Sequence, residues 1–398
     1  MTKIISVNAG SSSLKFQLFN MPSQEVLCSG IFERIGLADG IFQIKVDGKK
    51  DVVKQPFPTH SEAVNMLLHV LVDKKIVDSL DDITAVGHRV VHGGEYYNHS
   101  VLIDADVEAK IDELSDLAPL HNPANLIGYR SFAKALPHAK HVAIFDTAFH
   151  QTMPKDVYLY PIPMEYYKEF KVRRYGFHGT SHYYVSKRVA ELMGKSLSTL
   201  NIITCHLGNG ASICAVAQGK SVNTSMGFTP LAGIMMGTRS GDIDPAILTY
   251  IMDKTGKSAK EVVDILNKKS GMLGVSEFSS DARDIEKAFL EGEPTAILTR
   301  EMYANRIAHT IGSYFVQMGG VDAIVFTGGV GENDFGVRHD VTSKVSKALG
   351  IEFDTELNNK VRGSETLLSK FNSKVQIWLV PTNEELVIAQ DTYNIIND

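Results

Sequence analysis

Three short stretches rich in small residues could hold phosphate groups. They are residues 8–13 ("NAGSSS"), 208–212 ("GNGAS") and 328–333 ("GGVGEN"). Backbone amides in a tight turn can converge on an anion, and glycine lets the anion approach the backbone closely. Lys15 follows the first stretch and would add a cation. Any one stretch alone is compatible with an ordinary turn, but the three together favour a nucleotide-phosphate site.

The familiar nucleotide-binding motifs are incomplete in this chain. The "TGKS" at residues 255–258 has Ile251 where a P-loop needs glycine. The segments "GVGEND" and "GNGASI" end in Asp334 and Ile213 instead of the last glycine of the dinucleotide motif. Neither a P-loop nor a Rossmann site is therefore predicted.

Two arginines stand in unusual surroundings for a cation. Arg89 lies in the apolar segment 85–91, and Arg239 lies in "GTRSGDIDP". Burial of an unpaired charge is costly, so each needs a partner. The partner could be structural, for example Asp242 or Asp244. Alternatively, the planar guanidinium groups could bind carboxylate or phosphoryl oxygens.

Two acidic residues occupy positions suited to a metal or substrate. Asp146 ends the apolar strand predicted at 141–147, and ligands gather at the carboxyl ends of strands in α/β sheets. Glu384 falls in the first turn of a helix that Thr382 or Asn383 would cap. The structural alternatives are an N-cap for Asp146 and favourable interaction with the helix dipole for Glu384. The functional alternative for Glu384 is a ligand of hydrated Mg²⁺.

His178 lies between Gly176 and Gly179, which leave room beside its ring. A helix is predicted to start near residue 180 or 181, so His178 and His182 need not share a face, and a zinc site is not favoured. Hydrogen-bonded structural roles are expected for a further set, namely His88, His92, His121 and His206.

Apolar segments and helical periodicity alternate along the chain, which predicts an α/β protein. Buried strands of a mixed sheet are predicted at 3–7, 85–91, 141–147, 201–207, 322–329 and 375–381. Helices are predicted at 61–78, 182–195, 244–255, 258–269 and 295–318.

Residues 6–16 and 205–216 follow the same plan. Each has an apolar strand, a turn of small residues containing Gly10 or Gly210, and a second apolar strand. Two similar domains built from one unit are therefore predicted, although two unrelated hairpins would also give this pattern.

The composition indicates a protein of the cytoplasm. The 398 residues carry a net charge of -6, which argues against a general nucleic-acid binder. No apolar run reaches the length of a membrane span, so no membrane partner is expected. The three cysteines, Cys28, Cys205 and Cys214, predict reduced, buried thiols and no disulfide framework.

Nine motifs together closely resemble the acetokinase family, in its expected order from the first strand to the last helix. They are "NAGSSSLKF", "GHRVVHGGE", "APLHNPAN", "FDTAFHQTMP", "RRYGFHGTSH", "HLGNGAS", "TSMGFTPLAGIMMGTRSGDIDP", "TGGVGEN" and "PTNEELVIAQD". The resemblance implies the fold shared by acetate and sugar kinases, Hsp70 and actin, in which two similar domains close on a nucleotide. The implied domains are 1–150, completed by helix 384–398, and 151–383.

The resemblance also assigns residues. It implies Asp146, His178 and Arg239 as catalytic, with His178 and Arg239 stabilising the transition state, and Arg89 as the substrate-binding arginine. Val91, Leu120, Phe177 and Pro230 match the apolar pocket for the acetate methyl group. Lys15 matches a phosphate contact, and Asn8 with Glu384 matches the Mg²⁺ site. The ATP-binding segments match His206, Leu207, Gly208, Asn209, Gly210, Asp281, Ala282, Arg283, Gly329, Val330, Gly331, Glu332 and Asn333.

The implied activity is reversible transfer of a phosphoryl group from ATP to acetate, giving acetyl phosphate and ADP. The implied cofactor is Mg²⁺, with Mn²⁺ as a substitute, and the implied assembly is a homodimer. Because acetate is already ionised near neutrality, no base is needed, and Asp146 is predicted to orient Mg²⁺ and Arg89. The alternatives are a kinase that prefers propionate or butyrate, a non-catalytic Hsp70-like clamp, and a histidine-based metal hydrolase.

Overall fold

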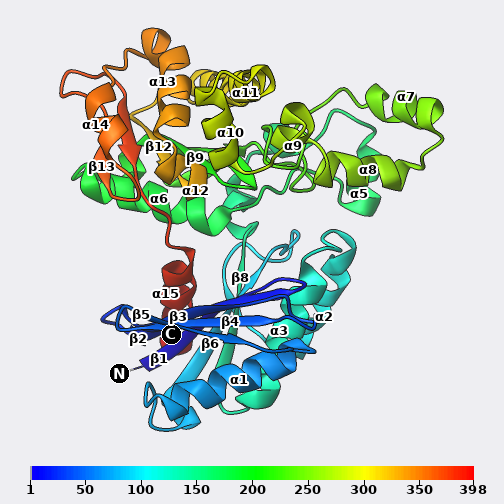
Figure 1. Ribbon diagram of the computed structural model, residues 1–398, viewed down its shortest axis with the longest axis vertical. Helices are drawn as coiled ribbons and strands as arrows, with labels where there is room; N and C mark the ends of the chain where they lie inside the picture. The colour runs from blue at the N-terminus through cyan, green and yellow to red at the C-terminus, as the bar shows by residue number, and fades with distance from the viewer. Residues whose placement is uncertain (1) are drawn as a thin grey trace. The chain divides into compact units, whose positions relative to one another are not determined.

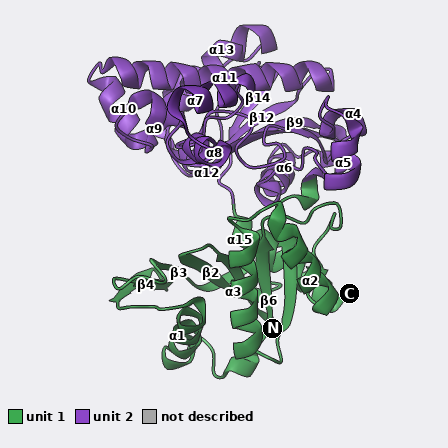
Figure 2. Cartoon of the chain, turned by 90° about the vertical axis from the view of Figure 1, so that its right-hand side faces the viewer, with its two compact units in different colours: residues 1–149, 383–398 green, residues 150–382 purple. Residues whose placement is uncertain are grey.

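The computed structural model describes residues 2–398 and contains two mixed β-sheets with helices packed on them (Figure 1). This confirms the predicted α/β class. The chain divides into two compact units, coloured separately in Figure 2. Unit 1 comprises residues 1–149 and 383–398, and unit 2 comprises residues 150–382.

Unit 1 is built on an eight-stranded sheet in the order β5-β4-β3-β2-β1-β6-β8-β7. The strands are β1 Thr2–Ala9, β2 Ser13–Met21, β3 Glu25–Glu33, β4 Ile41–Val46, β5 Lys49–Lys54, β6 Ile83–Val90, β7 Val101–Leu102 and β8 Lys140–Phe145. Helices α1 His60–Asp73, α2 Ala105–Glu113, α3 Asn122–Ala135 and α15 Glu384–Asn397 complete it. Short 3₁₀ turns lie at Leu80–Asp82, Leu114–Asp116 and Ala148–Thr152.

The last helix of the chain returns to unit 1. The buried residues Val387, Ile388 and Ala389 of α15 pack on strands β1, β6 and β8. Asn383 caps the helix, since its side chain accepts from the amide of Leu386. Of the two predicted caps, Asn383 is the one observed, and the predicted position of Glu384 in the first turn is confirmed.

Unit 2 is built on a six-stranded sheet in the order β11-β10-β9-β12-β14-β13. The strands are β9 Asn201–Leu207, β10 Ala211–Ala217, β11 Lys220–Thr224, β12 Ala323–Thr327, β13 Thr366–Leu367 and β14 Gln376–Leu379. The helices are α4 Lys155–Tyr158, α5 Met164–Phe170, α6 Gly179–Leu192, α7 Ala246–Thr255, α8 Ala259–Lys268, α9 Gly271–Ser276, α10 Ala282–Leu290, α11 Pro294–Met318, α12 Gly328–Asn333, α13 Phe335–Leu349 and α14 Thr355–Lys360, with a 3₁₀ turn at Leu197–Thr199.

The two sheets share a five-strand arrangement. In unit 1, β3, β2 and β1 are antiparallel neighbours, and β6 and β8 then run parallel to β1. In unit 2, β11, β10 and β9 are antiparallel neighbours, and β12 and β14 then run parallel to β9. The hairpins predicted from residues 6–16 and 205–216 are therefore equivalent elements of one repeated plan.

Several predicted boundaries need correction. Helix α1 ends at Asp73, five residues before the predicted end, because Lys75 adopts a left-handed conformation. Helix α6 begins at Gly179, before the predicted start. Residues 328–333, predicted as a loop, form the short helix α12, and the predicted loop 208–212 ends at Gly210, where β10 follows.

None of the helices between residues 2 and 398 is both long and apolar enough to cross a membrane. The cysteines Cys28, Cys205 and Cys214 are buried free thiols, as predicted.

Candidate active site

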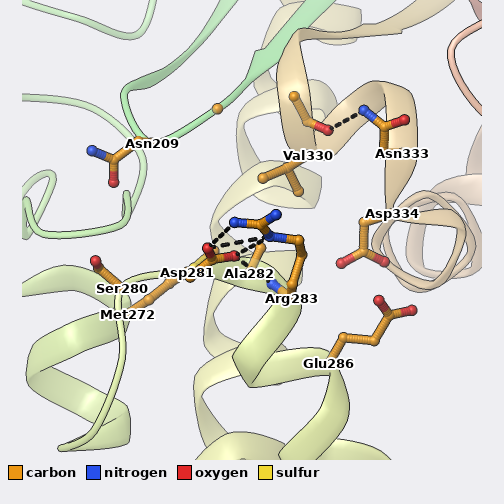
Figure 3. A pocket seen from close by; sticks show the side chains of 12 residues that line it. Asn209, Met272, Ser280, Asp281, Ala282, Arg283, Glu286, Val330, Asn333 and Asp334 are labelled. Atoms are coloured by element: carbon orange, nitrogen blue, oxygen red, sulfur yellow. Dashed lines mark hydrogen bonds and ion pairs between the residues drawn. The ribbon is translucent and has the colours of Figure 1, made fainter. Parts of the chain in front are cut away.

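A cavity of about 540 Å³ lies in unit 2 where three segments meet. These segments are the β9–β10 turn, the start of α10 and helix α12 (Figure 3). The lining includes eight of the predicted ATP-binding residues, namely Gly208, Asn209, Asp281, Ala282, Arg283, Gly329, Val330 and Asn333. Folding therefore brings three segments that are far apart in the sequence to one cavity.

Hydrogen bonds hold two walls of this cavity in place. Asp281 caps α10 by accepting from the amide of Arg283, and it also pairs with the Arg283 guanidinium. These contacts lower the pKa of Asp281 to about 2, first through the side chain of Arg283 and then through its amide. Asn333 Nδ2 donates to the Gly329 carbonyl at 2.9 Å across helix α12. The cavity wall is thus shaped without a ligand.

A pair of acidic side chains forms one side of the same cavity. The carboxylates of Asp334 and Glu286 face each other in Figure 3. Burial raises the pKa of Glu286, and the charge of Asp334 adds to the rise. Neither residue was predicted from the sequence, because an acidic pair is not a signature of a site for an anionic ligand.

Five predicted ATP-binding residues lie outside the cavity lining: His206, Leu207, Gly210, Gly331 and Glu332. Leu207 is fully buried, so its side chain belongs to the core. Glu332 Oε1 accepts from the amides of Gly328 at 2.9 Å and Thr382 at 3.1 Å. The Glu332 side chain therefore fixes the entrance to helix α12.

Arg338 is a residue of this region that the sequence analysis missed. Its fully buried guanidinium donates to the carbonyls of Gly331 and Glu332 at 2.9 and 3.0 Å, and also binds Asn358. Burial lowers the pKa of Arg338 to about 10. Five hydrogen bonds to neutral oxygens hold this cation, and they anchor the end of α12.

His178 and Arg239 approach each other above the turn that follows β9. A Cβ placed on Gly210 would lie 3.3 Å from Arg239 Nη1 and 3.7 Å from His178 Nε2. Both donor groups thus adjoin the same face of Gly210, and a side chain there would push into them. The same turn carries Gly208 and Asn209, which line the cavity. His178 and Arg239 therefore lie at the edge of the cavity.

The guanidinium of Arg239 is held by neutral groups. Its Nη1 donates to the Pro230 carbonyl at 3.2 Å and contacts Met236 Sδ at 3.7 Å. Among residues 2–398, no carboxylate forms an ion pair with it, and Asp242 instead accepts from the amide of Gly233. The structural ion pair considered for Arg239 is therefore wrong. Burial lowers the pKa of Arg239, because no anion offsets the charge.

His178 precedes helix α6 in a left-handed conformation, with φ of 56°. Its Nδ1 lies 2.8 Å from Ser212 Oγ on β10. Its ring stacks on that of His206, with centroids 4.2 Å apart. His182, one turn further along α6, bonds Thr204 and Ser212, so the Ser212 hydroxyl is a partner of both His178 and His182.

A second group of predicted site residues lies in unit 1. Arg89 on β6 makes a two-pronged ion pair with Asp146, which follows β8. Arg89 Nε donates to Oδ1 at 3.0 Å, and Nη2 donates to Oδ2 at 2.6 Å. The pairing follows from topology, since β6 and β8 are parallel neighbours with Val90 opposite Phe145. Burial opposes the charge on Arg89, but Asp146 outweighs it and the pKa of Arg89 rises.

Acidic residues of α15 lie beside this pair. Burial raises the pKa of Glu384 to about 7, with Arg89 opposing the rise and Asp146 adding to it. Lys15 Nζ makes an ion pair with Glu385, and Lys15 lies opposite Asn8 in the β1–β2 register. Unit 1 therefore brings Asn8, Lys15 and the start of α15 into one neighbourhood.

The donor set in this neighbourhood fits Mg²⁺. Asn8 and Glu384 offer oxygen ligands, which Mg²⁺ prefers. A nearby cation would also stabilise the charged form of Glu384, which burial disfavours. Among residues 2–398, no group of three histidine, cysteine or acidic residues is arranged to hold a metal on its own. Mg²⁺ commonly uses one or two protein carboxylates together with substrate phosphates.

The four predicted acyl-pocket residues are divided between the units. Val91 and Phe177 are buried, Pro230 is half-buried and Leu120 is exposed. Val91 and Leu120 belong to unit 1, whereas Phe177 and Pro230 belong to unit 2. The pocket that they would form stays a prediction.

Two buried asparagines of unit 1 hold the backbone of Val91 and His92 and were missed in the sequence. Asn125 accepts from the amide of Val91 at 3.1 Å and donates to the carbonyl of Ala9 at 2.8 Å. Asn122 makes the same kind of two-way contact with the backbone of His92. A side chain that bonds distant backbone cannot be read from local sequence, although both residues lie in the quoted motif "APLHNPAN".

A model of the Acetokinase family matches residues 3–390. The chain belongs to the acetokinase family. An acetokinase family relative from Anoxybacillus flavithermus, named acetate kinase, is 57% identical over 397 residues and covers 100% of both chains. Acetate kinase of Bacillus subtilis is 54% identical over 395 residues, covering 99% of this chain and 100% of its own.

Solved structures of acetokinase family members confirm the predicted actin-like ATPase fold. The acetate kinase of Porphyromonas gingivalis aligns with a TM-score of 0.95 at 47% identity, covering 100% of both chains. A propionate kinase from Francisella tularensis aligns with a TM-score of 0.94 at 43% identity, covering 99% of this chain and 100% of its own. Membership of the acetokinase family makes the chain a phosphotransferase that uses ATP and ADP. A non-catalytic clamp is therefore ruled out.

Proposed function

We propose that this protein transfers the γ-phosphoryl group of ATP to acetate and runs the reaction reversibly, with acetyl phosphate and ADP as products. The full-length relatives named acetate kinase, at 54–57% identity, support this acceptor. One observation carries the proposal: the donors of His178 and Arg239 adjoin Gly210, in the same turn as the cavity residues Gly208 and Asn209. A nucleotide in this cavity would direct its phosphates toward two donors.

The transferred phosphoryl group carries its charge on three equatorial oxygens. Arg239 binds these oxygens through a guanidinium that no carboxylate neutralises, and His178 adds a neutral or charged N–H donor. Catalysis of this kind depends on positioning and charge stabilisation, and little covalent help is needed. Both groups are held by neighbouring residues in the structure, which lowers the cost of orienting them for the reaction.

Arg89 holds the carboxylate of acetate in line with the phosphoryl group. Its ion pair with Asp146 uses Nε and Nη2, which leaves the orientation of the guanidinium fixed. Acetate needs no deprotonation, since a carboxylic acid has a pKa of about 4–5. Asp146 therefore acts by orienting Arg89 and the metal site and not as a base.

Asn8 and Glu384 would hold Mg²⁺, with Mn²⁺ as a substitute. When bound, the metal ion would offset charge on the β- and γ-phosphates. Lys15, an exposed cation opposite Asn8, would contact phosphate oxygens. Glu385 pairs with Lys15 and so sets its position before the nucleotide arrives.

Val91, Leu120, Phe177 and Pro230 are the residues proposed to contact the methyl group of acetate. Such a pocket separates acetate from propionate by only about 1–3 kcal/mol, the cost of one methylene group. The similarity to a propionate kinase at 43% identity favours propionate as a second, slower substrate.

The protein is proposed to be a cytoplasmic homodimer. Helix α7 has no buried side chain, and it exposes Ile247 and Tyr250, as is common for an apolar surface that meets another subunit. Three free buried thiols fit a reducing compartment. The two domains are proposed as 1–150 with 384–398, and 151–383. Sedimentation velocity tests the dimer, and a single species of 43.7 kDa would contradict it.

The reaction is tested by measuring ADP release together with hydroxylamine trapping of the acyl phosphate. The expected result is equal formation of ADP and acetyl hydroxamate, dependent on acetate, and slower product formation with propionate and butyrate. ADP release without hydroxamate would overturn the proposed acceptor. Faster turnover with propionate or butyrate than with acetate would replace acetate as the preferred substrate.

A further inference from the structure

Behind His178 runs a chain of hydrogen bonds that ends in the core of unit 2. Thr204 Oγ1 lies 2.6 Å from His182 Nδ1, and His182 Nε2 lies 2.8 Å from Ser212 Oγ. Ser212 Oγ also lies 2.8 Å from His178 Nδ1. Thr204, His182 and Ser212 are fully buried, so water cannot replace any of these bonds.

Thr204 fixes which atom donates in each of these hydrogen bonds. Its hydroxyl has one hydrogen to donate, and a buried donor without an acceptor costs about 1–3 kcal/mol. In the described part of the chain, His182 Nδ1 is the group that the Thr204 hydroxyl contacts. Thr204 therefore donates to His182 Nδ1, which must be unprotonated to accept.

The remaining directions follow from proton counting. A neutral imidazole carries one hydrogen, so His182 with a bare Nδ1 carries it on Nε2 and donates to Ser212 Oγ. Burial, with the charges of His150 and His206, holds the pKa of His182 well below its usual value, in keeping with a neutral ring. Ser212 thus accepts from His182, and its own hydrogen points to His178 Nδ1.

We propose that Ser212, directed by His182 and Thr204, is a positioning residue that keeps His178 in the neutral tautomer with its hydrogen on Nε2. Nε2 is the nitrogen that adjoins Gly210 together with Arg239 Nη1. His178 consequently presents an N–H donor, and not a lone pair, toward the place where the transferred group would lie. The catalytic consequence rests on the proposed function, whereas the tautomer itself does not.

A second series of hydrogen bonds gives His206, whose ring stacks on that of His178, the same tautomer. Thr382 Oγ1 donates to Ser181 Oγ at 2.8 Å, and Ser181 Oγ lies 2.7 Å from His206 Nδ1. Because Ser181 accepts from Thr382, its own hydrogen is left for His206 Nδ1. His206 and His178 thus stack with a serine hydroxyl on each Nδ1.

The test is NMR of the full-length protein labelled with ¹⁵N-histidine. Long-range proton–nitrogen correlation distinguishes the two tautomers, and His178→Gln assigns the signal. The experiment is run near pH 8.5, about two units above the ordinary imidazole pKa. The expected spectrum has the His178 hydrogen on Nε2 and a bare Nδ1. A hydrogen on Nδ1 in the wild-type protein would overturn the proposal.

The Ser212→Ala variant measures how the Ser212 hydroxyl affects the tautomer of His178 and kcat. Without the serine hydroxyl, His178 should shift toward the Nδ1–H tautomer. We expect kcat to fall about 10–100-fold, as for other residues that orient a reacting group, with KM for ATP and acetate changed less than about twofold. The matched control is Ser186→Ala, because Ser186 is an equally buried serine on α6 that donates only to the Tyr183 carbonyl. The control should keep both the tautomer and kcat.

Thr204→Val provides a second variant if Ser212→Ala folds poorly. It removes the hydroxyl that donates to His182 Nδ1, so His182 should populate both neutral tautomers. An unchanged His178 tautomer in Ser212→Ala, or an unchanged His182 tautomer in Thr204→Val, would overturn the proposal. A shifted His178 tautomer with unaltered kcat would uphold the hydrogen-bond chain and instead remove His178 from the proposed reaction.

Discussion

Arg89 and Arg239, the arginines predicted to bind the acceptor and the transferred phosphoryl group, are held in opposite ways. Arg89 in unit 1 is bound by both oxygens of Asp146, so its charge is balanced within the protein. Arg239 in unit 2 is bound by a carbonyl oxygen and a thioether sulfur, and its charge is not balanced. Accordingly, the pKa of Arg89 lies above its usual range, whereas burial lowers the pKa of Arg239.

The difference suggests a division of labour between the arginines. A guanidinium already paired with a carboxylate is rigid but weakly attractive to a second anion, which suits reversible binding of a small carboxylate. An unpaired, desolvated guanidinium gains most from an anion that develops strong negative charge. Arg239 should therefore matter mainly in the transition state, and Arg89 mainly in acceptor binding.

Removing Arg239 is expected to have the largest effect. Arg239→Ala should lower kcat about 10³-fold or more, as the loss of a phosphoryl-binding arginine does in other kinases and GTPases. KM for acetate should change by less than about threefold, because Arg239 does not bind the acceptor. Steady-state kinetics with the hydroxamate assay measures both values.

Arg188→Ala is the matched control for Arg239→Ala. Arg188 lies on α6 in unit 2 and makes surface ion pairs with Glu365 and Glu191. Its removal should leave kcat within about twofold, since exposed ion pairs contribute little. A loss of kcat below tenfold in Arg239→Ala would remove the distinction drawn between the two arginines.

Breaking the pair in unit 1 is expected to have the next largest effect. Asp146→Asn leaves one acceptor oxygen and removes the charge that pairs directly with Arg89, so the guanidinium loses its fixed orientation. We expect kcat/KM for acetate to fall about 10²-fold, as for other broken buried charge pairs, and the Mg²⁺ dependence to weaken. Near-normal turnover with an unaltered Mg²⁺ dependence would contradict the assigned role of Asp146.

Acid should destabilise both units through buried histidines, and in unit 1 burial lowers the pKa of His141, which contacts His88, as well as that of His88. Burial holds the pKa of His88 in unit 1 and His182 in unit 2 well below the usual value. Below pH 6.5 the unfolded chain takes up protons that the folded chain refuses, so the free energy of unfolding falls as pH falls. Each histidine contributes about 1.4 kcal/mol per pH unit in this range.

His88→Phe removes the contribution of His88. Between pH 7.5 and 5.5, the free energy of unfolding should fall by about 1 kcal/mol less in the variant than in the wild type. Urea unfolding at the two pH values measures both changes. An identical loss in both proteins would mean that His88 is not neutral in the folded state.

The acyl pocket is expected to give the smallest effect. Val91→Ala should raise the ratio of kcat/KM for propionate over acetate about fivefold, because it makes room for one methylene group. Val90→Ala, the same truncation one residue earlier in a separate core cluster, should leave the ratio unchanged. If the two variants behave alike, Val91 does not line the pocket.

Local patterns in the sequence were sufficient for the central elements. Strand β9 spans the predicted residues 201–207, and helix α11 begins one residue before its predicted start. The cap at Asn383 was also predictable, since an N-cap depends only on neighbouring residues. Arg89 and Asp146 were also predicted as site residues from local sequence, because Arg89 is a charged residue within an apolar segment and Asp146 ends one.

Elements that depend on distant partners could not be predicted. Strand β5 reads "KKDVVK", and its extended form comes from pairing with β4. Helix α12 is rich in glycine, and its ends are held by Arg338 and by Glu332. The neutral partners of Arg239 are likewise a carbonyl and a sulfur that only the folded loop 230–239 brings to it.

The most direct test is a crystal structure with ADP, Mg²⁺, acetate and a planar aluminium fluoride that imitates the phosphoryl group in transfer. The account predicts that Arg239 and His178 Nε2 donate to the fluoride atoms, while Arg89 binds the acetate carboxylate and keeps its pair with Asp146. A complex in which the fluoride is bound and Arg239 points away from it would contradict the account.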